Sequence, residues 1–568
     1  MPQYLLHSSS QAAVREAAES GCHFCSILVG CLTGCTGDHG ARERQRRPQD
    51  PLYISINLQD QKPGTFLLIL FPCEESQILD SYMDYTLQLA PVESDTLETT
   101  PDDELTASRA QTSTYSEATA ELIRSWIIQC QAEHPVCREK HSTLLQGQRP
   151  SMLGPRRLLD LQAFQTPGRI RLIEVENEPW LPYCALSYSW GRSEPYLLTV
   201  HNLSDFRKEI HLSNLPKTFR DAIEVVKGIG LRYLWADALC ILQGGETSPV
   251  ASEDWFDQTG KMSDIFGNSL ITIAASEAHD GSQGFITSRN PLSHTICRLD
   301  LETRLRFEVI PPCTPYCKSH PFDNAQYHLD TRSWVLQERL LSPRTIHFTR
   351  NFVHLECRSE IQCEAISQIK NCHHIGSHVK LEYQSLFAIL FGLEMDGLRE
   401  MAEEQFLTTW HRIVRKYSTT NLKWPSDLLV ALSGLMKPLQ DNFHLTWSFG
   451  LCRDFMLREM LWYVRGGRGV PSRDRAPTWS WASIDVCGPE IVNEPSSLTT
   501  LIACVTALPE AITLTRQPPL SEHESRFCVK VVGRLKPGVP SSMKPHPNAP
   551  SSKSLSNRNK NVGDDIEE

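Results

Sequence analysis

The chain lacks the features that would place it in or across a membrane. Its apolar runs are short, as in residues 66–71 (FLLILF), whereas a helix that crosses a bilayer needs about 20 apolar residues. The amino terminus, MPQYLLHSSSQ, has no basic stretch followed by an apolar core, which a secretory signal requires. We therefore expect a soluble, cytoplasmic protein with no membrane span.

An excess of basic residues is also missing. The 568 residues include 56 Lys and Arg against 67 Asp and Glu, a formal net charge of -11. A protein that binds nucleic acid without sequence preference needs a basic face to displace phosphate counterions, so we expect no nucleic-acid partner. The phosphate-binding pattern G-x-x-x-x-G-K-[ST] is absent too, which excludes a nucleoside triphosphatase of that type.

Cysteine is present but not in a disulfide pattern. The 19 cysteines are odd in number, spread over a long chain and preceded by no export signal, so we expect mostly reduced thiols. A hydrophobic content of 40% is enough for one large core or two to three smaller ones.

Composition and patterning divide the chain into seven regions. Residues 92–118 are acidic and rich in Ser and Thr, and 536–568 are rich in Pro, Ser and Asn, so neither has enough apolar groups to offset the entropy of ordering. The predicted regions are 1–91, an amino-terminal region with a cysteine-rich helix and a small sheet; 92–118, a linker; 119–182, a segment with a helix over 116–131 at its start; 183–350, the main domain; 351–485, mostly helical; 486–535, rich in strands; and 536–568, disordered.

The main domain shows the alternation of an α/β fold. Short β-branched or aromatic runs at 183–188, 233–237, 270–275 and 345–348 alternate with amphipathic helical stretches, which favours a mainly parallel sheet flanked by helices. In the helix predicted for 216–229, Phe219, Ala222, Ile223 and Val226 recur on one face.

Four blocks of this domain carry its most specific patterns. They are YCALSYSWG (183–191), LPKTFRDAIEVVKGIGLRYLWADALCILQ (215–243), EDWFDQTGKMSDIFGNSLITIAAS (253–276) and RSWVLQERLLSPRTIHF (332–348). In their order and spacing they resemble the fungal heterokaryon incompatibility (HET) domain family. Three later segments, WHRIVRKYS, SDLLVALSGL and APTWSWASID, resemble blocks that often follow this domain. Ser189 and Ala236 depart from the family's usual Cys and Ile.

The resemblance implies a role in self/non-self recognition and programmed cell death. It also implies a fold distantly similar to that of Toll/interleukin-receptor (TIR) domains, some of which cleave the nicotinamide glycosidic bond of NAD with a glutamate four residues after a tryptophan. Trp334 and Glu338 have this spacing, which places them one helical turn apart on one face. The carboxylate would then stabilise an oxocarbenium-like centre or orient the ribose hydroxyls. Alternatively, Glu338 pairs with Arg332 or Arg339, or caps a helix.

Two strand ends supply further candidates. Asp237 is the last residue of the run 233–237, and in open α/β sheets ligands bind beyond the carboxyl ends of the strands. Alternatively, Asp237 is an N-cap or a buried hydrogen-bond acceptor. Cys240 and Gln243 belong either to the same site as Asp237 or to the packing around it. The candidates for contact with an NAD-like ligand, each with core packing as its alternative, are Ser187, Tyr188, Trp190, Gly191, Cys240, Gln243, Arg332 and Gln337.

Zinc is the second cofactor that the sequence suggests. Cys22-x2-Cys25 has the spacing of a zinc knuckle, and Cys130, His134 and Cys137 form a C-x3-H-x2-C group that would complete a tetrahedral site. Buried free thiols are the alternative. A looser group of Cys and His residues at 357–374 is assigned no site.

Three functions stay open at this stage. The first is a TIR-like NAD glycohydrolase with Glu338 as its catalytic residue. The second is a signalling module without catalysis, which acts through self-association or through a partner from an incompatible allele or an upstream sensor. The third is a regulator with a decayed domain.

Overall fold

A computed structural model describes the chain in segments. The described residues are 4–33, 52–58, 66–72, 85–91, 111–138, 154–176, 178–191, 195–244, 248–293, 295, 297–300, 306–310, 327–350, 352–364, 379–393, 399–465, 470–471, 475–485, 490–492, 512–517 and 526–531. The predicted disordered region, 536–568, lies outside them.

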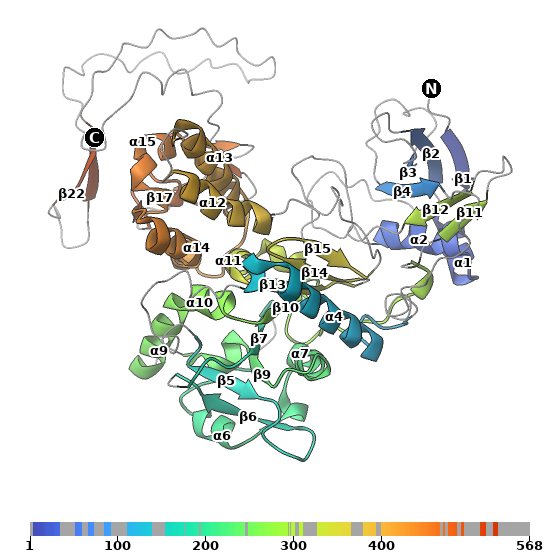
Figure 1. The fold of residues 1–568 in the computed structure, drawn as a ribbon, viewed down its shortest axis with the longest axis horizontal. Coiled ribbons are helices and arrows are strands. Elements are labelled where there is room, and N and C mark those ends of the chain that lie inside the picture. The colour runs from blue at the N-terminus through green and yellow to red at the C-terminus, as the bar shows by residue number, and fades with distance from the viewer. Residues whose placement is uncertain are drawn as a thin grey trace, which may run out of the picture.

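A nine-stranded sheet forms the centre of the molecule, in the order β15-β14-β13-β10-β7-β9-β5-β6-β8 (Figure 1). Its strands are β5 (Arg157–Asp160), β6 (Arg169–Glu174), β7 (Tyr183–Ser187), β8 (Ile210–His211), β9 (Tyr233–Trp235), β10 (Ile271–Ala275), β13 (Arg344–Phe348), β14 (Val353–Cys357) and β15 (Ile361–Cys363). The four apolar runs of the main domain thus become β7, β9, β10 and β13, which confirms the predicted α/β class.

Only the middle of this sheet is parallel. β13, β10, β7 and β9 pair in parallel, with Ile273 of β10 between Ile346 and Leu186, while the flanking strands pair antiparallel. The sheet is therefore mixed rather than mainly parallel, because residues 157–174 and 353–363 extend it as hairpins. β7, β10 and β13 are buried along their whole length, as expected for strands covered on both faces.

Helices cover the parallel strands on both sides. The helices of this part are α4 (Glu117–Glu133), α5 (Pro135–Arg138), α6 (Leu203–Lys208), α7 (Lys217–Gly228), α8 (Asp237–Cys240), α9 (Pro249–Gly260), α10 (Met262–Gly267) and α11 (Ser333–Leu341). α7 packs against α4, and α10 and α11 pack against α14 (Leu428–Phe443). In Figure 1 these two groups lie on opposite sides of β7, β9 and β10.

Local sequence explains where the predicted helices begin and end. Ser116 caps α4 by accepting from the Thr119 amide, and Pro216 precedes α7, whose buried face includes the predicted Phe219. Gly230, with φ +81°, ends that region in the left-handed conformation. Residues 111–116 run alongside 285–289, where the Thr114 amide donates to the Thr287 carbonyl at 2.9 Å.

The amino-terminal region forms a second sheet, in the order β1-β2-β3-β4-β12-β11. Its strands are β1 (Tyr4–Ser8), β2 (Leu52–Leu58), β3 (Phe66–Pro72), β4 (Tyr85–Pro91), β11 (Cys297–Asp300) and β12 (Arg306–Ile310), and α1 (Gln11–Glu19) and α2 (His23–Thr33) accompany it. The two strands from 297–310 therefore leave the main domain to pair with the small sheet.

The region predicted to be mostly helical, 351–485, begins with the strands β14 and β15, and helices follow them. The elements after residue 364 are α12 (Val379–Leu393), α13 (Arg399–Ser418), α14, α15 (Met456–Glu459), β16 (Trp447–Ser448), β17 (Leu451–Cys452), β18 (Tyr463–Arg465), β19 (Val470–Pro471), β20 (Ile484–Asp485), β21 (Glu490–Val492), β22 (Ile512–Gln517) and β23 (Arg526–Val531). Short 3-10 helices span Leu212–Asn214, Pro291–Ser293, His328–Thr331, Pro425–Asp427, Arg453–Phe455 and Trp481–Ser483. Within the described ranges, no helix has the length and apolarity that a membrane span needs.

Candidate functional site

The order of the parallel strands reverses beside β7. In chain order β7 pairs with β9 on one side, and the chain then crosses to β10 on the other side of β7. Such a reversal in an open parallel sheet is where ligands bind, beyond the carboxyl ends of the strands. Ser187 ends β7, and Asp237 follows β9 as the first residue of α8.

Gly191 lets the loops after β7 and β10 meet. It has φ +65°, a conformation that favours glycine. A Cβ at this position would lie 2.1 Å from the Cβ of Asp280 and 2.7 Å from the carbonyl oxygen of His279. Glycine is therefore favoured at position 191 both by the left-handed backbone and by the close approach of the loop after β10.

Glu338 lies under the carboxyl end of β7. It is 8% exposed, and Ser187 donates its hydroxyl to Oε2 of Glu338. Burial and, to a smaller extent, the charge of Asp237 raise the pKa of Glu338, while Ser187 and Arg332 lower it, and the result is a pKa of about 7. This side chain therefore changes charge near neutral pH, as a general acid or base does.

Asp237 is held beside Trp190. The Trp190 indole donates to Oδ2 of Asp237 at 2.8 Å, and the Ala238 amide donates to Oδ1 at 2.7 Å. Burial raises the pKa of Asp237, although Arg332 and these donors oppose the rise. Asp237 and Trp190 both keep part of their surface exposed, so this end of the site is open to solvent.

Tyr188 and Arg332 connect the two carboxyl groups. Arg332 donates to the backbone carbonyl of Tyr188, and burial raises the pKa of the Tyr188 hydroxyl well above its usual value. Asp237, Arg332 and Glu338 all act electrostatically on that hydroxyl. The ring of Tyr188 packs edge-on against Phe219 of α7, with centroids 5.1 Å apart, which fixes its orientation.

Four other candidates make their hydrogen bonds or close contacts with residues other than Glu338 and Asp237. Trp334 hydrogen-bonds the carboxyl group of Asp427, before α14. Gln337 is buried against Gly434 of α14, where a Cβ would come within 1.8 Å of Oε1 of Gln337. Cys240 is buried in the core, and its carbonyl accepts from Arg157. The backbone N–H of Gln243 donates to the Leu198 carbonyl, and its side-chain amide donates to the Ile241 carbonyl at 3.3 Å.

Two histidines near the site were missed in the sequence. The rings of His279 and His328 lie 4.0 Å apart, and burial, then His279 and Arg332, lower the pKa of His328. His279 follows β10 and therefore belongs to the same edge of the sheet as Ser187. The residues around His279 form no recognisable motif. The one signal in the sequence is its position shortly after the strand predicted for 270–275, where ligand-binding residues of α/β sheets lie.

A buried polar network on β13 and β14 was also missed. The His347 ring contacts Oγ of Ser276 at 3.2 Å through Nδ1 and Oε2 of Glu356 at 3.1 Å through Nε2. Ser276, His347 and Glu356 are 1%, 2% and 2% exposed, and Arg339 donates to both carboxylate oxygens of Glu356. The arrangement has the residue types of a hydrolase triad, but burial and the Arg339 pair make it structural.

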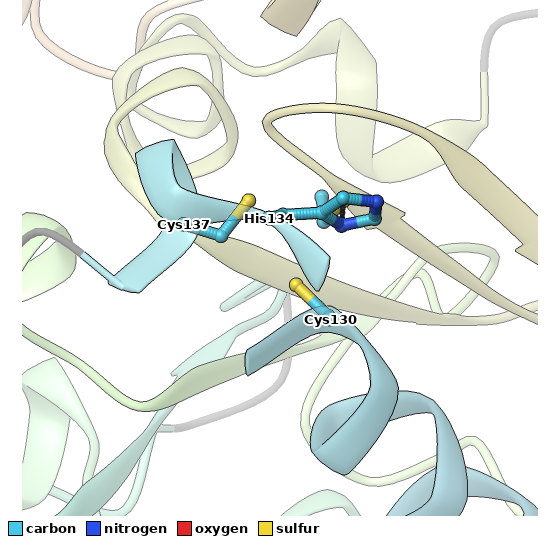
Figure 2. Close-up of side chains that lie close together, drawn as sticks. Cys130, His134 and Cys137 are labelled. Atoms are coloured by element: carbon cyan, nitrogen blue, oxygen red, sulfur yellow. Dashed lines mark hydrogen bonds between the residues drawn. The ribbon is translucent and has the colours of Figure 1, made fainter. Parts of the chain in front are cut away.

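A cluster of three cysteines and one histidine lies at the edge of the nine-stranded sheet. The Cys/His cluster consists of Cys130, His134, Cys137 and Cys357, whose ligand atoms all lie within 4.8 Å of one another. Cys130 is near the end of α4, His134 is the residue at which α4 stops, and Cys137 is in α5. Figure 2 shows these three side chains facing a common space; Cys357 reaches it from the end of β14.

Donors surround the sulfur atoms of the cluster. Nε of Arg344 donates to Sγ of Cys130 at 3.1 Å, and the amides of Ser359 and Glu360 donate to Sγ of Cys357 at 3.3 and 3.2 Å. Hydrogen bonds from the neighbouring thiols lower the pKa of Cys137 and raise the pKa of Cys357.

Comparison with known proteins adds one finding to this geometry. Residues 183–338 match the family model described as heterokaryon incompatibility protein (HET). No curated protein and no solved structure gives a match. The HET segment begins at Tyr183, the first residue of β7, and ends at Glu338, so it contains both carboxyl groups of the site.

The predicted zinc ligands are corrected in one respect. Cys130 and His134 do lie together with Cys137, but Cys357 completes the group, not Cys22 and Cys25. Cys25 is buried with Cys22 and Cys297 as its neighbours, and burial raises its pKa to about 12. α2, which carries Cys25, packs on β11 of the amino-terminal sheet, whereas Cys357 lies in β14 of the nine-stranded sheet.

Proposed function

We propose that the protein acts in heterokaryon incompatibility, in the cytoplasm, as a self/non-self recognition protein whose activation ends in cell death. The match of residues 183–338 to the HET family model supports the first part of this proposal. The site beside β7 supports an enzymatic route to cell death, because two acidic side chains and an arginine converge there at a strand-order reversal.

The reaction that best fits this site is hydrolysis of the bond between nicotinamide and ribose in NAD, as in TIR-like enzymes. The C1′–N bond breaks, and its electron pair leaves with nicotinamide. Water adds its oxygen to C1′ and loses a proton, which gives ADP-ribose. The positive charge that develops on the ribose requires a nearby carboxylate.

Glu338 is the residue to which we assign that charge stabilisation, and this assignment rests on one observation. It is a buried carboxyl group with a pKa raised to about 7, whose donor Ser187 lies at the end of β7. Above that pH the carboxylate is available to stabilise the ribose cation and to take the proton of water. Trp190, rather than Trp334, is the aromatic residue beside the carboxyl groups, through its bond to Asp237.

Nicotinamide release tests the enzymatic proposal. Purified full-length protein at high concentration is incubated with NAD, beside Glu338→Gln and the matched surface variant Glu404→Gln, whose side chain is exposed on α13. We expect release by the wild type and by Glu404→Gln, with Glu338→Gln at least about 100-fold slower. No release by the wild type, or equal release by Glu338→Gln, would contradict the proposal.

A module that acts by binding a partner is the second candidate. Two apolar side chains of α9, Val250 and Phe256, are 62% and 68% exposed and would supply contacts to such a partner. In that case Glu338→Gln would keep the incompatibility reaction in cells, whereas Phe256→Ser would lose it. The reverse pattern favours the enzyme.

A further inference from the structure

We propose that the Cys/His cluster binds one zinc ion through three thiolates and one imidazole. The ligand atoms come from two places that are far apart in the sequence: the break between α4 and α5, and the turn between β14 and β15. The metal would therefore fix the helix that precedes the HET segment to the edge of the central sheet. This role is separate from the Glu338 site and does not depend on it.

The spacing of the ligand atoms fits a tetrahedral ion. Zinc–sulfur bonds of about 2.3 Å place the sulfur atoms of a tetrahedral site about 3.8 Å apart. The ligand atoms of the cluster all lie within 4.8 Å of one another, and Nδ1 of His134 is already 3.5 Å from Sγ of Cys357. Small side-chain rotations therefore suffice, and the backbone does not have to move.

The backbone around the ligands explains why they converge. α4 stops at His134, which has extended φ and ψ angles of -112° and 92°, and Pro135 begins the next turn. This break turns Cys137 back toward Cys130. On the other side, the amides of Ser359 and Glu360 both point at Sγ of Cys357, as backbone amides do toward a metal-bound thiolate that carries negative charge.

The outer contacts also suit a metal site. Nε2 of His134 faces Oε1 of Glu360 at 3.7 Å, the carboxylate partner that orients many zinc-binding imidazoles. Three thiolates and Zn²⁺ have a net charge of -1, and Arg344 donates to Cys130 and to the carbonyl of Cys137. With four protein ligands the site has no open position, which is typical of structural rather than catalytic zinc.

Metal content and a cobalt spectrum test this proposal on the full-length protein. We expect about one zinc per chain after dialysis against a weak chelator, and tetrahedral thiolate-to-cobalt absorption when cobalt replaces zinc. Zinc below about a tenth of an equivalent, or cobalt without thiolate bands, would overturn the proposal. Both measurements use the wild type, so neither depends on a variant that folds.

Matched variants identify the ligands. Cys357→Ser should lower the zinc retained at a fixed chelator concentration at least about tenfold, while Cys25→Ser, another buried cysteine outside the cluster, should retain the wild-type amount. The opposite result, with Cys25→Ser losing zinc and Cys357→Ser keeping it, would show that the Cys22 pair holds the metal and would overturn the assignment.

Discussion

Glu338 and Glu356 are two buried glutamates of neighbouring elements, 8% and 2% exposed, with opposite electrostatic surroundings. Burial raises the pKa of Glu338 to about 7, and its direct hydrogen-bond donor, the neutral hydroxyl of Ser187, offsets only part of the rise. Burial opposes the ionisation of Glu356 as well, but Arg339, His347 and Lys380 hold its pKa well below the usual value.

The difference separates a structural acid from a candidate functional one. Glu356 is compensated by Arg339 on both carboxylate oxygens, so its charge is a fixed part of the core. Glu338 lacks such a direct ion pair among the described contacts and has a second carboxyl group, Asp237, close enough to raise its pKa. Acids in the second situation are found preferentially at active sites.

The largest effect that we expect follows removal of the compensated charge. Glu356→Gln should lower the free energy of unfolding by about 3–5 kcal/mol at pH 7, because it leaves Arg339 buried with only part of its negative partner set. The difference in stability between the wild type and the variant should become smaller below about pH 4.5. In that range Glu356 is protonated in the unfolded wild type but stays ionised in the folded state, which lowers the stability of the wild type. Denaturant unfolding of both proteins measures it; a loss under about 1 kcal/mol would contradict the comparison.

Glu338→Gln should raise the free energy of unfolding, by less than Glu356→Gln lowers it. The pKa of Glu338 is raised from 4.5 to about 7 on folding, so the folded state binds its proton more tightly, and the wild type loses stability as the pH rises between these values. Glu338→Gln avoids this loss and should become more stable than the wild type by up to about 3 kcal/mol at pH 8. Unfolding at pH 5 and pH 8 tests the sign; a variant less stable at both pH values contradicts it.

The smallest effect concerns the hydroxyl that contacts Glu338. Ser187→Ala removes the donor to Oε2 of Glu338 and should lower the free energy of unfolding by about 1.5 kcal/mol above pH 8, where the carboxylate is charged. At pH 5, where Glu338 is protonated, the loss should be smaller. Equal losses at both pH values would mean that Ser187 acts through packing alone.

Much of the central fold was predictable because its strands are short apolar runs separated by helices with regular periodicity. β7, β10 and the buried face of α7 follow directly from those patterns. The antiparallel hairpins were not predictable, because strand pairing depends on contacts between distant segments. For the same reason, β11 and β12 joined the amino-terminal sheet although they lie within the predicted main domain.

The site was predictable where it depends on strand ends. Ser187 and Asp237 were placed by the rule that ligands bind beyond the carboxyl ends of parallel strands, and the structure brings both toward Glu338. Helical spacing placed Trp334 on the same helix face as Glu338, but it could not show that the Trp334 side chain hydrogen-bonds Asp427. The C-x3-H-x2-C spacing likewise identified three members of the Cys/His cluster. Cys357 is more than 200 residues away, in the looser group at 357–374 to which the sequence assigned no site.

The central claim is that Glu338 is a buried carboxyl group that is protonated below about pH 7, and infrared difference spectroscopy tests it most directly. Spectra of the wild type minus Glu338→Gln, taken from pH 5 to pH 9, should contain one protonated-carboxyl band that disappears with a midpoint near pH 7. The variant Glu404→Gln should leave that band unchanged. A wild type without the band at pH 5 would show that Glu338 is ionised throughout, and would contradict the account.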